Sequence, residues 1–253
     1  MKYLFPSSRL RSWFSGTSRR LILAAGLTAA LPVKTDESVS WPDTFVARLE
    51  ALALIQTLNA DLLASRSATR SLEGWCRDHR LAAEPKIVAR VMAGLDKAPT
   101  QEQRQRLEVT DQEPVKYRRV QLQCGTQVLS EAENWYVPGR LTPEMNRLLE
   151  TTGIPFGMVV ESLQPYRRTF AVKLLWTPLP VGWERDPGCQ PLGTGGTLAI
   201  PDAIFEHRAL LYTHEHQPFA EVVEVYQRQL LAFGPWLPSN TGQDAPTCPS
   251  GRP

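Results

Sequence analysis

Apolar and polar residues alternate between Lys116 and Arg140 in a pattern that predicts a β-hairpin. The apolar positions of its first half are Val120, Leu122 and Cys124, and the polar positions between them are Arg119, Gln121 and Gln123. A period of two is typical of a strand. A turn at residues 124–127 leads to a second apolar run, which Pro138-Gly139 ends. The hairpin holds more polar residues than a purely structural one needs, namely Arg119, Glu131, Glu133 and Asn134.

Three segments show the three- and four-residue spacing of helices. The first begins after Pro42-Asp43 and runs to Ala64, with an apolar stripe formed by Phe45, Leu49, Leu52, Ile55, Leu58 and Leu62. The second follows Ser67-Ala68-Thr69, and its inner face holds Leu72, Trp75 and Cys76. The third starts at Thr142-Pro143, a typical cap with proline in the first turn, and ends at Gly153.

Further strands are predicted at residues 86–92, 169–176, 205–212 and 218–233. Residues 96–114 are interpreted as a loop or a short surface helix, and residues 177–203 as an irregular insertion. Two helices are thus followed by mostly consecutive antiparallel strands with one inserted helix. This order predicts an α+β fold in which helices pack on an antiparallel sheet.

The two ends of the chain differ from its middle. Residues 1–31 hold basic residues and no acid, and a short apolar run at 21–33 follows Arg19-Arg20. This build is typical of an export signal, since spanning a bilayer takes ~20 apolar residues. We expect a leader and linker at 1–40, one domain at 41–233 and a disordered tail at 234–253. The protein is then periplasmic or otherwise exported, or cytoplasmic if the leader is not a signal.

The charge distribution argues against a nucleic-acid partner. The whole chain has a formal charge of +2, but five of its 28 bases lie in residues 1–31, which leaves 23 bases against 26 acids. The rest of the chain is therefore mildly acidic and lacks the basic surface of a nucleic-acid binder. After removal of a leader we expect no stable membrane span.

Common catalytic and metal motifs are absent from the sequence. There is no GxSxG, HExxH or GxGxxG, and none of the four cysteines forms a CxxC pair. His214 and His216 lack a third ligand nearby, so we expect no metal site. Cys76 and Cys124 are either buried thiols or, in an exported protein, a disulfide.

Glu224 interrupts an apolar run that otherwise predicts a buried strand. A buried carboxylate is costly unless it is paired or protonated, so Glu224 needs a partner or a ligand. Arg119, on another strand, is a natural counterpart because arginine can bind a carboxylate through two hydrogen bonds. The alternatives are an internal ion pair and a position on a solvated edge.

The element order and several short motifs resemble chorismate pyruvate-lyase and the wider chorismate lyase-like fold, which is shared with effector-binding domains of some bacterial transcription regulators. The matching motifs between Asp43 and Phe233 are Ser67-Ala68-Thr69, Arg119, Cys124, Pro138, Pro155-Phe156-Gly157, and Gln217-Pro218 ahead of Glu224.

The resemblance implies a site. In that family an arginine at the position of Arg119 holds the ligand carboxylate, together with backbone amides of the segment matching Ala68. The turn matching Phe156 supplies a backbone contact, and a glutamate like Glu224 meets the hydroxyl of the aromatic product. We therefore expect catalytic roles for Arg119 and Glu224, and substrate binding by Ala68, Arg119, Asn134 and Phe156. The family uses neither a metal nor an organic cofactor.

Two departures leave the function open. Asn134 replaces a second arginine of the enzyme, and Glu224 aligns only if one residue is inserted after Pro218, so Glu221 is an alternative. The first hypothesis is a lyase that eliminates pyruvate from chorismate to give 4-hydroxybenzoate. The second is a non-catalytic exported protein that binds a small aromatic carboxylate in the same pocket. The third is a structural protein in which Arg119 and Glu224 pair with each other.

Overall fold

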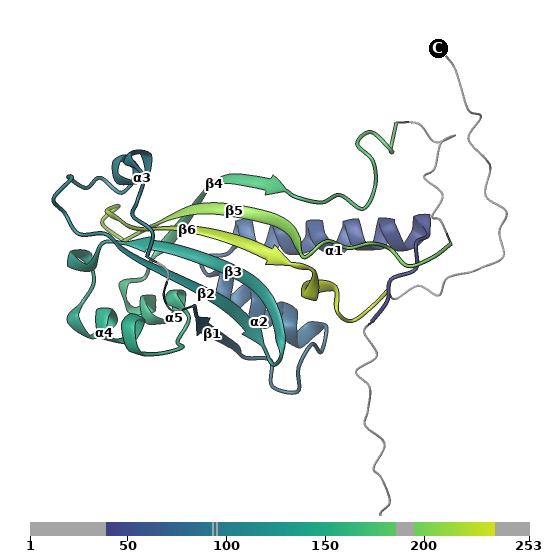
Figure 1. Cartoon of the computed structure of the whole chain (residues 1–253), viewed down its shortest axis with the longest axis horizontal. Helices are drawn as coiled ribbons and strands as arrows, with labels where there is room; N and C mark the ends of the chain where they lie inside the picture. Colours follow the sequence, from purple (N-terminus) through teal and green to yellow (C-terminus); the bar gives the residue numbers. More distant parts are fainter. Residues whose placement is uncertain (1–38, 93, 95, 186–194, 236–253) are drawn as a thin grey trace, which may run out of the picture. The chain divides into compact units, whose positions relative to one another are not determined.

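The computed structural model describes residues 39–92, 94, 96–185 and 195–235. Within them, six strands form one antiparallel sheet in the order β1-β2-β3-β6-β5-β4 (Figure 1). The strands are β1 Ile87–Val91, β2 Lys116–Cys124, β3 Gln127–Tyr136, β4 Tyr166–Leu174, β5 Ala203–Tyr212 and β6 Pro218–Gln227. The predicted fold class, an α+β domain with helices packed on an antiparallel sheet, is confirmed. The predicted leader up to residue 38, residues 186–194 and most of the predicted tail lie outside the described residues.

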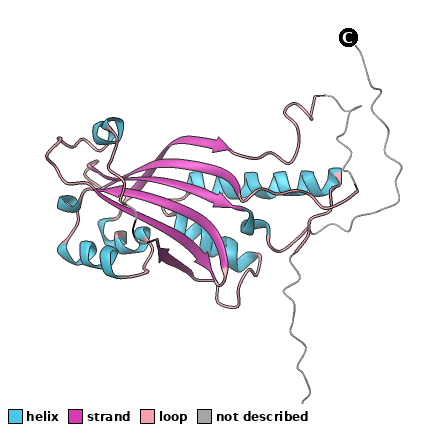
Figure 2. Ribbon diagram, viewed as in Figure 1, coloured by secondary structure: helices cyan, strands magenta, loops and turns pink. Residues whose placement is uncertain are grey.

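Helices pack against the sheet (Figure 2). The helices are α1 Phe45–Ala64, α2 Ala68–Asp78, α3 Gln101–Arg106, α4 Pro143–Thr151 and α5 Phe156–Val159, and the 3-10 turns are η1 Pro138–Arg140, η2 Glu161–Leu163 and η3 Arg228–Leu231. One apolar cluster joins α1 and α2 to the sheet, and a second joins α4 and α5 to it. No helix in the described ranges is long and apolar enough to cross a membrane.

Strand alternation decides which side chains face the helices. Val120 of β2 lies beside Ala132 of β3, which lies beside Glu224 of β6. All three are buried on the side covered by α1 and α2. Side chains at odd positions of β2, such as Arg119, point to the opposite face, because successive residues of a strand alternate. The hairpin predicted at 116–140 is confirmed, with Gly125 at its turn.

Several predicted boundaries are wrong by a few residues. Helix α1 begins at Phe45 after Thr44, whose Oγ1 accepts from the Ala47 amide at 3.2 Å. Leu49 of the predicted stripe is 36% exposed, because the buried face is centred on the positions of Ala47 and Ala51. Strand β6 ends at Gln227 and not at 233, since the 3-10 turn η3 follows it directly.

Gly153 is needed for packing rather than as a left-handed helix cap. A Cβ atom at this position would lie 2.8 Å from the carbonyl oxygen of Ala89. The Ala89 amide donates to the carbonyl of Gly153 at 2.9 Å. The chain beyond α4 therefore runs directly against β1, and any larger residue would push the two apart.

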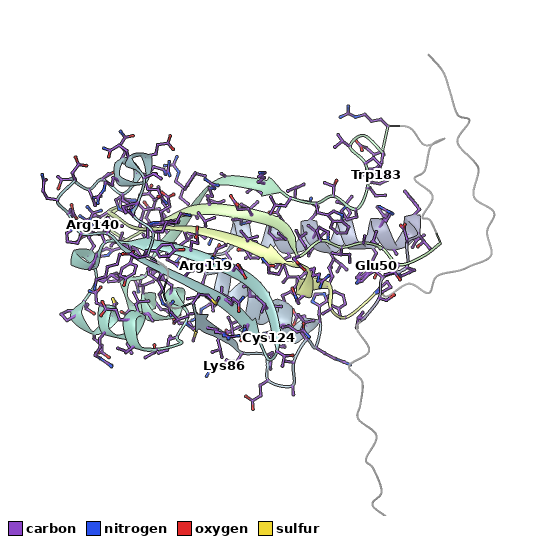
Figure 3. All side chains as sticks on the ribbon, viewed as in Figure 1. Glu50, Lys86, Arg119, Cys124, Arg140 and Trp183 are labelled. Atoms are coloured by element: carbon purple, nitrogen blue, oxygen red, sulfur yellow. A yellow bond between two sulfur atoms is a disulfide. The ribbon has the colours of Figure 1, made fainter. Side chains whose placement is uncertain are left out.

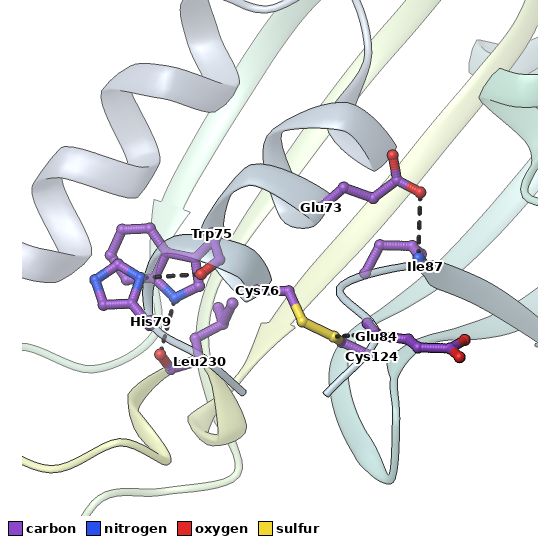
Figure 4. Close-up of a disulfide and its surroundings, with 8 residues drawn as sticks. All are labelled: Glu73, Trp75, Cys76, His79, Glu84, Ile87, Cys124 and Leu230. Atoms are coloured by element: carbon purple, nitrogen blue, oxygen red, sulfur yellow. Dashed lines mark hydrogen bonds between the residues drawn. A yellow bond between two sulfur atoms is a disulfide. The ribbon is translucent and has the colours of Figure 1, made fainter. Parts of the chain in front are cut away.

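A disulfide joins Cys76 of α2 to Cys124 at the tip of β2 (Figure 4). Both cysteines are fully buried. Around it, Trp75 Nε1 donates to the carbonyl of Leu230 at 2.9 Å, and the Ile87 amide donates to Glu73 at 3.2 Å. The bridge fixes α2 against the hairpin, so the start of α2 is held at a set distance from the strands.

Candidate ligand-binding site

A cavity of about 790 Å³ lies over the helix-covered face of the sheet. Strand residues such as Val120, Leu122 and Val222 form its floor, and residues 65–70 and 156–161 form its walls. The two walls meet at Gly157, where a Cβ would lie 3.4 Å from Ser67 Oγ. The lining is mostly apolar, and the volume falls within the roughly 300–1,000 Å³ typical of small-molecule sites.

A buried ion pair stands on this floor. Arg167 Nη1 of β4 lies 2.7 Å from Glu224 Oε2 of β6, and both side chains are more than nine-tenths buried. The Tyr226 hydroxyl donates to the same oxygen at 3.0 Å. Burial opposes the charge on Arg167, but Glu224 and Tyr226 outweigh it and raise the pKa of the guanidinium. The Arg167 guanidinium therefore stays charged and lies against the Glu224 carboxyl group.

The pair leaves one hydrogen-bond donor unused. Arg167 Nη2 is buried and has no partner, although Arg167 lines the cavity. An unmade hydrogen bond from a buried charged group costs free energy. A ligand oxygen in the cavity would satisfy this donor.

His207 of β5 lies beside the ion pair. Its Nε2 is 2.7 Å from Asn59 Oδ1, whereas its Nδ1 is buried without a partner. Burial, aided by the charge of Arg167, lowers the pKa of His207 to about 4. The imidazole is therefore neutral near pH 7. Neutral imidazole carries one proton, so bonding to an amide oxygen places that proton on Nε2.

The buried His207 predicts a loss of stability in mild acid. The unfolded chain binds a proton near pH 6.5 and the folded protein only near pH 4, so stability is full above pH 6.5 and falls as the pH drops to about 4. The total change is about 3 kcal/mol. Urea unfolding at several pH values should show this slope in the wild type and not in His207→Gln. The exposed His214→Gln variant should keep it; an unchanged slope in His207→Gln would contradict the assignment.

The structure brings four of the predicted site residues together. Ala68, Asn134, Phe156 and Glu224 all line the cavity. The expected irregularity after Pro218 is present: Tyr212 pairs with Pro218 and Leu211 with Ala220, which leaves Phe219 as the extra residue. This bulge turns Glu224 toward the helices.

Arg119 does not join them. It lies on the other face of the hairpin, where its Nη2 contacts Glu131 Oε2 at 2.8 Å. Figure 3 labels the position of Arg119 on the sheet. The expected pairing of Arg119 with Glu224 is therefore wrong, because the two side chains are on opposite faces of the sheet. The same face accounts for the other polar residues of the hairpin. Glu131 pairs with Arg119, and Glu133 accepts a hydrogen bond from the Tyr117 hydroxyl at 2.6 Å.

Arg118 takes the place expected of Arg119 on the helix-covered face. It is 5% exposed, and its Nη2 donates to the carbonyls of Thr152 at 3.2 Å and Ile154 at 3.1 Å. Its Nε and Nη1 are buried without partners, and burial lowers its pKa. Among the described residues it forms no ion pair with a carboxylate. Within that part of the chain, Arg118 is thus a buried cation without an anionic partner.

Arg118 does not itself line the cavity, but it contacts neighbours of residues that do. Asn134 is its neighbour in register and donates through Nδ2 to the Arg118 carbonyl at 3.3 Å. Asn134 and Phe156, two residues beyond Ile154, both line the cavity.

The choice between Glu221 and Glu224 is settled by the strand face. Glu221 lies on the opposite face, where Arg106 donates to it through Nε at 2.8 Å and Nη2 at 2.9 Å. Gln103 of α3 adds a third contact at 3.2 Å. Glu224 is therefore the carboxylate that faces the cavity.

In the part of the chain that the structure describes, no group of three or more histidine, cysteine or acidic residues could hold a metal ion.

The fold is α+β, and its cavity has a volume in the range of small-molecule sites. No protein-family model matches the sequence. The chain belongs to the same family as the "Uncharacterized protein y4mC" of Sinorhizobium fredii (strain NBRC 101917 / NGR234), with 45% identity over 224 residues that cover 86% of this chain and 94% of that protein.

Solved structures give weaker matches. The effector domain of PhnF from Mycobacterium smegmatis is 12% identical with a TM-score of 0.41, over 64% of this chain and 88% of that one. A GntR-family transcriptional regulator from Enterococcus faecalis V583 is 10% identical with a TM-score of 0.36, over 55% of this chain and 93% of that one. YydK of Bacillus subtilis, described as a possible transcriptional regulator, is 17% identical with a TM-score of 0.36, over 57% of this chain and 58% of that one. Likenesses at this level do not identify a ligand.

Proposed function

We propose that this protein binds a small aromatic carboxylate in the cavity and does not act as a lyase. The observation that carries the proposal is Arg118, a buried guanidinium with two unpartnered nitrogens and no carboxylate partner in the described residues. A buried unpaired charge is costly, and a carboxylate offers two parallel hydrogen bonds to neighbouring guanidinium nitrogens. A carboxylate ligand supplies the missing anion.

The cavity walls favour an aromatic body. Val120, Leu122, Leu211 and Val222 are apolar and line the cavity, and Phe156 adds an aromatic face. Burying a ring against such side chains stabilises the complex by about 25 cal/mol per Å² of apolar surface removed from water. The start of α2, at Ala68, lines the same space, and the amides of a helix's first turn have no partner within the helix.

Two features favour binding over catalysis. Asn134, where the enzyme pattern has a second arginine, removes a positive charge from a site that would have to hold the doubly charged chorismate. Glu224 is engaged by Arg167 and Tyr226. Elimination of pyruvate depends on electrostatic stabilisation of the separating charges, and neither the uncharged Asn134 nor the engaged Glu224 offers a free charge for it.

We also propose that the protein is exported. A disulfide between Cys76 and Cys124 is stable in an oxidising compartment and rare in the cytosol, and the basic and apolar N-terminal segment has the composition of a signal. Mass spectrometry of the protein from fractionated cells tests this. A shortened N-terminus and blocked thiols in the periplasmic fraction are expected. An intact Met1 with free thiols in the cytosol would refute export.

Titration calorimetry with 4-hydroxybenzoate tests the binding proposal, and incubation with chorismate tests the lyase. Saturable one-to-one binding is expected, with no release of 4-hydroxybenzoate from chorismate at high protein concentration. Aniline, which has a similar ring without a carboxylate, serves as the negative control. Absence of heat with 4-hydroxybenzoate and other aromatic carboxylates would overturn the binding proposal, and a rising product absorbance would establish the lyase.

A further inference from the structure

The cavity is much larger than one aromatic ring. An apolar cavity of about 150 Å³ is enough to bind benzene. The cavity of this protein has a volume of about 790 Å³. A single ring with one carboxylate would therefore leave most of the space to water. Because apolar walls are better covered by apolar groups than by water, a ligand that fills more of the space gains affinity.

The floor of the cavity extends over five neighbouring strands. Its lining includes Leu122 of β2, Ala132 of β3, Val222 of β6, Leu211 of β5 and Tyr166 of β4. These strands follow one another in the sheet, and neighbouring strands lie about 4.8 Å apart, so the floor is roughly 19 Å across. The shape of the cavity therefore suits an elongated ligand better than a compact one.

Part of this floor is a continuous apolar strip, formed by Val120, Leu122 and Ala132. All three residues are buried and line the cavity. In the register of β2 and β3, Ala132 pairs with Val120, and Asn134 pairs with Arg118. Leu122 lies four residues along β2 from Arg118, which is roughly 13 Å. The apolar strip thus runs away from the end of the cavity at which the carboxylate is proposed to bind.

Ala132 decides how much room lies above the apolar strip. It is 4% exposed and lies between Val120 and Glu224 in the strand register. Its side chain ends at Cβ, so a larger residue here would project from the sheet into the cavity. Met158 of α5 lines the cavity as well and is 39% exposed. The flexible thioether of a methionine adapts to apolar groups of different shapes.

We propose that the ligand is an amphipathic carboxylate, in which an aromatic head carries an apolar substituent that lies along the apolar strip. Ala132 is then the residue that determines how large a substituent the site accepts. This inference rests on the proposed function, because the carboxylate contact is taken from it. It goes further by assigning the part of the cavity that one ring does not fill.

Calorimetric titrations of the full chain with benzoate, 4-butylbenzoate and 4-hexylbenzoate test the proposal. Each buried methylene group should strengthen binding about four-fold, so the wild type should bind 4-hexylbenzoate at least about 100-fold more tightly than benzoate. In Ala132→Leu this ratio should fall below about ten-fold, because the added side chain occupies the space of the substituent. Ala60→Leu, at an exposed position of α1, should keep the wild-type ratio.

A second variant guards against misfolding of Ala132→Leu, which urea unfolding would reveal. Met158→Trp adds bulk at a half-exposed position of the opposite wall, and it should lower the same ratio.

The outcomes separate this inference from the proposed function. Equal affinity of the wild type for all three compounds would overturn the elongated ligand and leave aromatic carboxylate binding intact. A wild-type ratio in both Met158→Trp and folded Ala132→Leu would also overturn it, because the substituent would then lie elsewhere. Failure of all three compounds to bind would instead overturn the proposed function.

Discussion

Arg118→Met is expected to abolish binding of 4-hydroxybenzoate while leaving the ligand-free protein at least as stable as the wild type. The wild-type guanidinium is buried with two unpartnered nitrogens, and its charge is not compensated by a carboxylate in the described residues. Methionine fills a similar volume without a charge, which removes that cost. Truncating one partner of a buried charge pair costs about 2–5 kcal/mol of binding free energy, or roughly 30- to 5,000-fold in affinity.

The matched control is the next residue along the same strand. Arg119→Met removes an arginine from the opposite face, where it pairs with the half-exposed Glu131, and such pairs contribute at most about 1 kcal/mol. Its affinity for 4-hydroxybenzoate should equal that of the wild type. Affinity by calorimetry and stability by urea unfolding should be measured on both variants. Loss of binding in Arg119→Met with retention in Arg118→Met would refute the assignment of the anchor.

Removal of the Cys76–Cys124 disulfide is expected to lower the free energy of unfolding by about 4 kcal/mol. The bridge joins residues 48 positions apart, and closing a loop of this length restricts the unfolded chain by about that amount. Both sulfurs are buried, so the free thiols would still pack as small apolar groups, and the loss should come mainly from the unfolded state. For a domain of this size, such a loss is a large part of the total stability.

Urea unfolding with and without reductant measures this loss. The wild type should unfold at lower urea concentration once reduced, and Cys76→Ser/Cys124→Ser should match the reduced wild type in either condition. Mass spectrometry must show that the thiols are free in the reduced sample. Coincident curves for oxidised and fully reduced wild type would contradict the expected contribution.

The sequence predicts the fold well because its strongest signals are local. The alternation in β2, the cap before α4, and the turn at Gly125 each appear at the expected place. The least accurate boundary is the end of β6, where the apolar residues of η3 continue the strand pattern although the chain turns. Tertiary packing decides that boundary, and the local sequence does not.

The error at Arg119 was avoidable from the sequence. Val120, Leu122 and Cys124 are the apolar set of β2, so their period of two places Arg118 with them and Arg119 with the polar set. The resemblance to the lyase family points to Arg119, whereas the alternation of β2 places Arg118 on the face that the helices cover. A shift of one residue moves a strand side chain to the other face.

Arg167 could not be found in the same way. Its role depends on the registers of β4, β5 and β6 together, since a side chain opposite Leu211 on β5 has to reach Glu224 on the next strand. Strand β4 is an edge strand with mostly exposed side chains, so its sequence gives no sign of a buried arginine. The one available signal was the requirement of a buried Glu224 for a cation, which does not say where that cation lies.

A crystal structure of the protein with 4-hydroxybenzoate tests the central claim most directly. We predict a ligand in the cavity, with its carboxylate about 3 Å from Arg118 Nε or Nη1. A carboxylate bound to Arg167 with Arg118 still unpartnered, or a ligand outside the cavity, would contradict it.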